Sequence, residues 1–288
     1  SPNNPAIPAG MTAARKQFLY DSIGAIDIDY ADVFFRQGVS QSHEINMTTG
    51  TEKTKIFFSA GYFDQQGIDL GSQLKRYTTR FNLDHTIGKL TIGFNTTAGY
   101  SISKFAEGDI YGNSPRNPFQ MIYRAKTYEN PYNADGSLIF GANTTLALKQ
   151  VGNLLEGINN SSRTIYQTKI NTGLTLSYKL TKDITVKNLL GVDVASEYHN
   201  RYINANSYIG SLQTFQSGLA QEASRVASNF INTSSAVFAK KFNNVHDVEV
   251  GAYFEVVRIY QRSLGFTLYN LDPRLSQTGQ GAGALPTN

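Results

Sequence analysis

The chain of 288 residues contains no cysteine and no tryptophan, and only four of its residues are histidine. Without cysteine it can form no disulfide framework, no thiolate metal site and no cysteine nucleophile. The four histidines lie far apart and have no metal-ligand spacing, so a zinc enzyme is not expected. Charged residues make up only 17% of the chain, against about 25% in an average globular protein.

Long apolar runs and concentrated positive charge are also missing. No window approaches the roughly 18 consecutive apolar residues that a membrane helix requires, which excludes a helical membrane protein. The net charge of +4 comes from dispersed residues, and the longest basic run is Lys240-Lys241. Nucleic acid is therefore not an expected partner.

Alternation of apolar and polar residues is the clearest positive signal. Over residues 90–103 the even positions are mainly apolar, whereas the odd positions are polar or glycine. Within 184–198 the alternation is interrupted at Asn188 and Leu189. A further strand is predicted over 224–242, but the sequence does not separate its two faces. The other predicted strands are 76–84, 166–180, 184–198 and 248–256, with weaker ones at 44–49 and 54–63.

Short and long connections alternate along the chain. In an antiparallel up-and-down sheet, consecutive connections fall on opposite edges, so one edge would carry only tight turns and the other only loops. With strands of about ten to eighteen residues, this arrangement predicts a transmembrane β-barrel. The short connections are 49–53, 87–89, 181–183 and 243–246, and the long ones are 64–73, 104–162 and 204–222.

A soluble antiparallel sandwich would show the same alternation, with its apolar faces packed into a core. Sandwich strands usually run about five or six residues, and the segments here are two to three times as long. Their polar faces are rich in glycine, threonine, serine and asparagine, which suits a watery lumen. The barrel is therefore favoured over the sandwich.

Segment 104–162 is where function is expected to concentrate, because so long a connection is unusual and such loops are commonly functional. Its aromatic, arginine and asparagine side chains suit stacking on sugar rings or gripping a peptide. The alternative, that the aromatics only pack the loop onto itself, stays equally open. The candidate substrate-binding residues are Tyr111, Arg116, Phe119, Tyr123, Arg124, Tyr128 and Tyr132.

No motif for covalent chemistry is present. Asp27, Asp29 and Asp32 crowd one stretch, but they lack the closing glutamate and the turn glycine of a calcium loop. A solvated segment is the favoured interpretation. We predict no catalytic residue, no metal site and no cofactor, and the chain is not expected to be an enzyme.

Five ordered runs between residues 29 and 84 carry a denser signature. They read YADVFFRQG at 30–38, SHEIN at 42–46, GTEKT at 50–54, SAGYFDQQGI at 59–68, and KRY with RFNLD within 75–84. In this order they resemble the SusC/RagA family, the TonB-linked outer-membrane importers of Bacteroidetes. The motif Asn117-Pro118-Phe119 and residues 128–132 also look like the first long extracellular loop of that family. The family usually has Asp-Trp where this chain has Asp29-Tyr30.

This resemblance implies an all-β fold, an antiparallel transmembrane β-barrel of 22 strands. About eight of those strands, with long extracellular loops, would belong to this chain. Residues 1–38 would be the passage from a plug domain to the barrel and the start of the barrel. Residues 39–288 would be the N-terminal part of the barrel, with its long extracellular loop at about 104–162.

Physical reasoning also favours a part of a larger barrel. An open arc of eight strands would leave two unpaired edges in lipid, which is not tolerated. A closed eight-stranded barrel fills its interior with side chains, yet the inward positions here are often glycine, serine and threonine. We therefore expect the chain to need the remainder of its barrel.

The implied function is import of oligosaccharides or peptides across the bacterial outer membrane, without covalent chemistry. A SusD-like surface lipoprotein would close the extracellular mouth, and TonB would act through a plug region that this chain does not include. The barrel wall would contact outer-membrane lipid on one side. A passive porin, a small self-contained barrel and a soluble β-sandwich adhesin remain alternatives. The residues expected to face the lumen are Arg76, Arg80, Asp84, Lys169 and Lys187.

Overall fold

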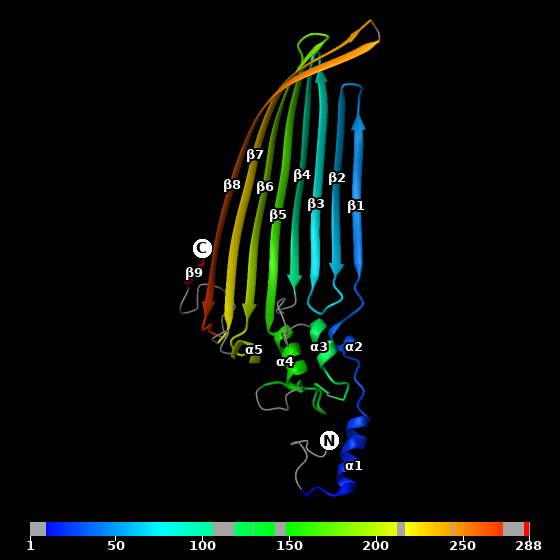
Figure 1. Cartoon of the computed structure of the whole chain (residues 1–288), viewed down its shortest axis with the longest axis vertical. Coiled ribbons are helices and arrows are strands. Elements are labelled where there is room, and N and C mark those ends of the chain that lie inside the picture. Colours follow the sequence, from blue (N-terminus) through cyan, green and yellow to red (C-terminus); the bar gives the residue numbers. More distant parts are fainter. Residues whose placement is uncertain are drawn as a thin grey trace.

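The computed structural model describes residues 10–105, 118–128, 130–141, 148–211, 217–243, 245–272 and 285–287. Its dominant feature is one antiparallel sheet whose strands follow one another in chain order (Figure 1). The three-residue strand β9 (Leu285–Thr287) pairs with the end of β8. The eight long strands are β1 (Ser40–Gly50), β2 (Thr54–Gln66), β3 (Gln73–Ile87), β4 (Leu90–Phe105), β5 (Ser161–Lys179), β6 (Ile184–Ile203), β7 (Leu219–Phe242) and β8 (His246–Tyr269).

The helices lie at the end of the sheet opposite the short turns (Figure 1). We call this end the loop end and the other the turn end. Among the described residues, no helix is both long enough and apolar enough to cross a membrane. The helices are α1 (Ala13–Gly24), α2 (Tyr30–Phe34), α3 (Pro118–Arg124), α4 (Leu148–Asn159) and α5 (Tyr208–Ser211).

The strand register assigns every strand residue to one of two faces, because directly opposed residues of an antiparallel pair point the same way. One side carries Phe94, opposite Leu83 on β3 and Leu174 on β5. We call it the apolar face. The other side carries Asn95, opposite Asn82, and we call it the polar face. The alternation predicted from the sequence is thus confirmed on β3 to β6.

The register also resolves the strand whose faces the sequence left open. On β7, Phe230 lies opposite Val192 on the apolar face, whereas Ile231 lies opposite Gly191 on the polar face. The interruption at Asn188 is real, since this residue lies on the apolar face. Its Nδ2 donates a hydrogen bond of 2.9 Å to Oγ of Ser234 on β7, so its amide is partly satisfied without water.

The turns are staggered along the register. Gly50 pairs with Lys55 at the β1–β2 turn, and the register leads from Lys55 strand by strand to Thr233 on β7. The β7–β8 turn closes at Phe242, nine residues farther along β7. From the first turn to the last, the turn position therefore moves by nine residues, or about 30 Å along the strands. The same two turns are six strand spacings apart, which is about 29 Å across the sheet. If the turns share one level, the strands tilt by about 45°, as in transmembrane barrels.

Segment 104–162 is not a simple loop, because it contains α3 and α4 and ends where β5 begins at Ser161. Apolar side chains on these helices form a small core with α2. Phe34 and Val151 are fully buried in it. The buried members are Tyr30, Phe34, Met121, Val151, Leu154 and Leu155. The core joins the segment before β1 to the long connection after β4.

Candidate functional site

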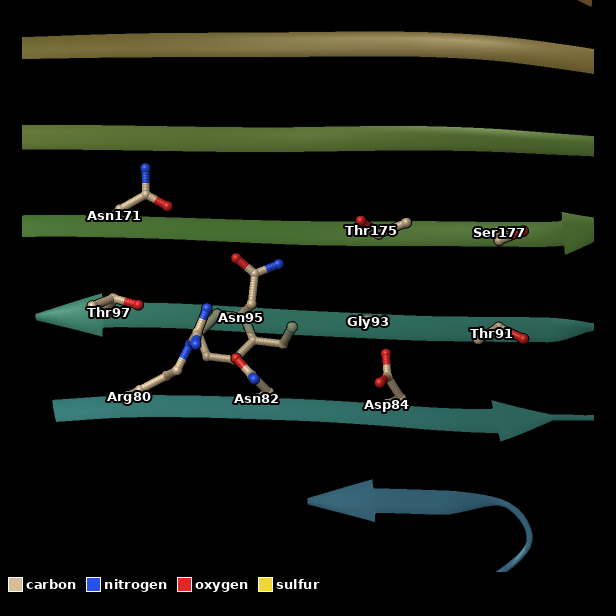
Figure 2. Close-up of a pocket in the computed structure, with 11 residues that line it drawn as sticks. Arg80, Asn82, Asp84, Thr91, Gly93, Asn95, Thr97, Asn171, Thr175 and Ser177 are labelled. Carbon is tan, nitrogen blue, oxygen red and sulfur yellow. The ribbon is translucent and has the colours of Figure 1, made fainter. Parts of the chain in front are cut away.

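A polar hollow of about 410 Å³ lies on the polar face of β3, β4 and β5 (Figure 2). Arg80 and Asp84 come from β3, Asn95 from the middle strand, and Asn171 and Thr175 from β5. The register brings these residues together, since Arg80 opposes Thr97 and Asp84 opposes Gly93. Only one strand of the three carries charges in this hollow, and both signs are present.

Two glycines shape the hollow. A Cβ atom at Gly93 would lie 3.1 Å from Oδ1 of Asp84, and one at Gly173 would lie 3.0 Å from both amide atoms of Asn95. Both contacts are tighter than ordinary side-chain packing. The absence of side chains there leaves room for the carboxylate and the amide to occupy the face.

Further along the polar face, charged and amide groups form a cross-strand network. Nζ of Lys169 lies 3.6 Å from Oδ2 of Asp193, which also accepts a 3.2 Å hydrogen bond from Nδ2 of Asn171. Nε2 of Gln167 donates to Oε1 of Glu197 at 2.7 Å. These side chains are partly exposed, so each contact contributes little to stability. Their value is a hydrated wall that offers donors and acceptors.

The five residues predicted to face a lumen all lie on this polar face. Arg80 and Asp84 line the hollow, and Lys169 belongs to the network beside it. Arg76 lies nearer the loop end, with its guanidinium 5.2 Å from the ring centre of Phe63. Lys187 opposes Ser177, another residue of the hollow. Their shared face is established, and a lumen on that side stays a prediction.

A second hollow, of about 340 Å³, lies near the loop end of β6 to β8. Glu197 and His199 of β6 and Arg225 of β7 line this hollow. The small residues Ser263 and Gly265 of β8 also line it. Nε2 of His199 lies 3.4 Å from Oε2 of Glu197. No sequence pattern predicts this cluster, because only the register places Arg225 opposite Glu197.

The aromatic candidates of segment 104–162 have different surroundings. The ring of Phe119 packs 4.8 Å from that of Phe35, so this residue holds the loop against the segment before β1. Tyr123, on α3, is 91% exposed. Tyr128 is exposed beside Lys126, whose Nζ lies 5.7 Å from the ring centre. Phe119 thus has a packing contact while half of it is exposed, Tyr123 is almost fully exposed, and a binding role for either residue stays a prediction.

The other loop candidates are less fully placed. Tyr132 is exposed and forms a β-bridge with Leu138. Tyr111 and Arg116 lie outside the described residues. Arg124 ends α3, and its side chain is not among those described. A role for any of these residues in binding stays a prediction.

Glu156 is a buried carboxylate that no sequence motif marks. It lies on α4, and its Oε1 accepts hydrogen bonds from the backbone N–H of Tyr208 at 3.0 Å and from Nδ2 of Asn160 at 3.1 Å. Its Oε2 has no hydrogen-bond partner in the described part of the chain. Burial raises the pKa of this carboxyl. Glu156 thereby joins the two long loops that follow β4 and β6.

The acidic stretch before β1 has a structural role. Oδ1 of Asp29 accepts a 2.8 Å hydrogen bond from the N–H of Ala31 and caps α2. Asp27 and Asp29 border a hollow of about 430 Å³ against Ile122 of α3. No group of three or more potential metal-ligating side chains occurs among the residues that the structure describes.

Comparison with known proteins identifies relatives in one class. No family model matches the chain. It is 26% identical over 274 residues to TonB-dependent receptor P39 of Formosa agariphila, covering 88% of this chain and 23% of that receptor. It is 28% identical over 127 residues to TonB-dependent receptor SusC of Bacteroides thetaiotaomicron, covering 43% of this chain and 12% of SusC. The chain thus spans about a quarter or less of these curated relatives.

Solved structures agree on the fold. A structure of the RagAB peptide transporter matches with a TM-score of 0.75 and 18% identity, over 97% of this chain and 34% of that chain. The RagAB peptide importer in its closed-closed state matches with a TM-score of 0.73 and 20% identity, over 91% and 30%. The predicted all-β, antiparallel fold and the resemblance to SusC/RagA proteins are confirmed.

Proposed function

We propose that the chain forms part of the wall of a SusC/RagA-type, TonB-dependent importer in the bacterial outer membrane. One observation carries the proposal: eight long strands lie in chain order with short turns at one end and helix-bearing loops at the other. In outer-membrane barrels the short turns are periplasmic and the long loops extracellular. The apolar face then contacts lipid, and the polar face borders the lumen.

The proposed role is passage of substrate without covalent chemistry. The relatives are receptors and importers, and a wall with dispersed, hydrated charges suits a path along which substrate binds weakly and moves on. The substrates we propose are oligosaccharides or peptides, both rich in hydrogen-bonding groups. Arg76, Arg80, Asp84, Lys169 and Lys187 would supply the polarity of the lumen wall.

Two partners belong to the proposal. A SusD-like surface lipoprotein would close over the loop end, where α3 and α4 pack on α2. TonB would act through a plug region outside this chain. The division at residue 38, with the plug-to-barrel passage before it, remains part of the proposal. Helix α2, which lies just before β1, packs against α3 and α4 at the loop end.

Energy-dependent uptake tests the transport proposal. In cells that carry the whole protein, uptake of a labelled oligopeptide or oligosaccharide mixture should require both the protein and TonB. Deletion of TonB should reduce uptake to the level of cells that lack the protein. Uptake that persists without TonB would instead identify a passive porin.

The loop candidates can be tested in the whole protein with matched tyrosine variants. Tyr123→Ala and Tyr128→Ala should weaken substrate capture, since aromatic stacking on a ligand contributes about 0.5–1.5 kcal/mol. Tyr20→Ala is the control, because Tyr20 is also exposed but lies on α1. Equilibrium binding of the labelled substrate measures the effect. Equal affinities for all three variants would reject a binding role for Tyr123 and Tyr128.

A further inference from the structure

On the apolar face of β8, two arginines interrupt the apolar residues, which resume at Leu264. After His246 at the turn end, five successive positions over nine residues are apolar. This length suits a tilted strand that crosses the hydrocarbon of a bilayer, which takes about 9–11 residues. The next positions on the same face are Arg258, Tyr260 and Arg262. The apolar positions before them are Val248, Val250, Ala252, Phe254 and Val256.

The stagger of the sheet places this change at the outer edge of the membrane. An aromatic row crosses the apolar face of β1 to β4, and we take its last member, Tyr100, as the level of the outer edge on β4, because aromatic girdles mark the edges of such barrels. The register leads from its last member, Tyr100, to Arg262 on β8. The stagger of about 1.5 residues per strand, taken over four strands, moves the membrane edge on β8 by about six residues toward the turn end. The edge on β8 therefore lies near Val256. The row is His43, Tyr62, Tyr77 and Tyr100.

The chemistry around the two arginines favours an anion. Both side chains are exposed, and they project from the same face four residues apart, a separation of about 13 Å. Ser228 of β7 lies directly opposite Tyr260 and adds a hydroxyl between them. In the described part of β7 and β8, the one carboxylate on this face is Glu222, opposite Phe266 and beyond Arg262. An anion at this position would therefore meet hydrogen-bond donors and little repulsion from carboxylates.

Arginine at this depth is costly only if it faces hydrocarbon. The cost is about 2–4 kcal/mol at the midplane of a bilayer and falls to about 0–1 kcal/mol near its edges. The guanidinium group binds phosphate oxygens through two parallel hydrogen bonds. A phosphorylated headgroup at the same level is thus the partner whose charge and position both match.

We propose that Arg258, Tyr260 and Arg262 form an outward-facing site for phosphorylated headgroups of outer-leaflet lipid. The site rests on the membrane orientation of the proposed importer but not on its substrate. Its occupant is a lipid, held by the arginines at the headgroup and by the apolar residues of β8 along its acyl chains. Such a site would fix the height of β8 in the membrane.

Native mass spectrometry of the whole protein in mild detergent tests the site. The probes are dioctanoyl phosphatidic acid and, as the comparison that lacks the phosphate, dioctanoylglycerol. The double variant Arg258→Gln, Arg262→Gln should bind phosphatidic acid about tenfold more weakly than the unmodified protein. The single variants Arg258→Gln and Arg262→Gln are compared with Arg225→Gln, which likewise removes one positive charge near the same level but on the polar face. The heat-modifiable mobility of folded barrels verifies that every variant is folded.

Three results would overturn the proposal. The first is equal binding of phosphatidic acid by the double variant and the unmodified protein. The second is equal displacement of phosphatidic acid by inorganic phosphate at the same concentration, which would show a site for free phosphate. The third is loss of a two-copy species in the double variant with unchanged lipid binding, which would show that a second copy covers the arginines.

Discussion

The assignment of the two faces makes adjacent residues of β5 respond oppositely to the same substitution. Leu174 lies on the apolar face between Phe94 and Leu190, and Thr175 lies on the polar face beside Gly93. We expect Leu174→Arg to destabilise the whole protein strongly. Thr175→Arg should be nearly neutral, because Thr175 borders a polar hollow with room for a longer side chain.

The magnitudes follow from the position of Leu174 in the bilayer. The aromatic edge at Tyr100 corresponds to about residue 170 on β5, and the β5–β6 turn begins at 180, so Leu174 lies near the middle of the crossing. An arginine facing lipid there costs about 2–4 kcal/mol. In the hydrated lumen the cost should be below about 1 kcal/mol. Leu174→Ala separates lost packing from the charge effect.

The assay is the free energy of unfolding of the whole protein in phospholipid vesicles, from urea titrations followed by tyrosine fluorescence and gel mobility. The difference between the two arginine variants should exceed about 1 kcal/mol, and Leu174→Ala should fall between them. If Thr175→Arg costs as much as Leu174→Arg, the division into a lipid face and a lumen face is wrong.

Two further predictions concern the loops and the polar face. Because burial raises the pKa of Glu156, the folded protein keeps the proton of this carboxyl to a higher pH than the unfolded chain does. The contribution of protonated Glu156 to the free energy of unfolding is therefore complete below the usual glutamate pKa. It is lost as the pH rises through the pKa of Glu156 in the folded protein. Glu156→Gln should keep the acceptor for the N–H of Tyr208 and abolish that pH dependence. The measurement is the rate of limited proteolysis between β6 and β7 as a function of pH. An unchanged pH profile would refute the role of Glu156 in joining the two loops. A Cβ at Gly191 would lie 2.5 Å from Cγ2 of Ile231, whereas one at Gly99 meets nothing closer than 3.8 Å. In urea titrations Gly191→Ala should therefore cost about 1–3 kcal/mol and Gly99→Ala little, and equal effects would contradict the packing.

Much of the sheet could be predicted from alternation alone, and the exceptions have physical causes. On β7, the neighbours Phe230 and Ile231 are both apolar, so only pairing with β6 separates their faces. On β8, the prediction ended at residue 256 although the strand continues to Tyr269. Past that point Arg258 lies on the outward face and Ile259 on the inward one, which inverts the pattern.

The site was harder to predict because it depends on residues distant in sequence. The hollow on the polar face needs Asp84, Asn95 and Thr175 from three strands, and Gly93 and Gly173 to leave the space. The loop helix α4 did have a signal, since Val151, Leu154, Leu155 and Ile158 recur at helical spacing. In the sequence, the aromatic residues of segment 104–162 form a more conspicuous pattern than this helical periodicity.

The stagger of the turns also sets the width of the barrel. At a tilt of about 45°, strands about 4.8 Å apart each occupy about 7 Å of circumference. Eight such strands closed on themselves would form a tube with a radius of about 9 Å, which the arginine and lysine side chains of the polar face would fill. The 22 strands that the resemblance to SusC/RagA proteins implies would give a bore close to 50 Å across, measured between backbones. An inner wall of that curvature needs no side chains to fill it, which explains why glycine, serine and threonine are acceptable there.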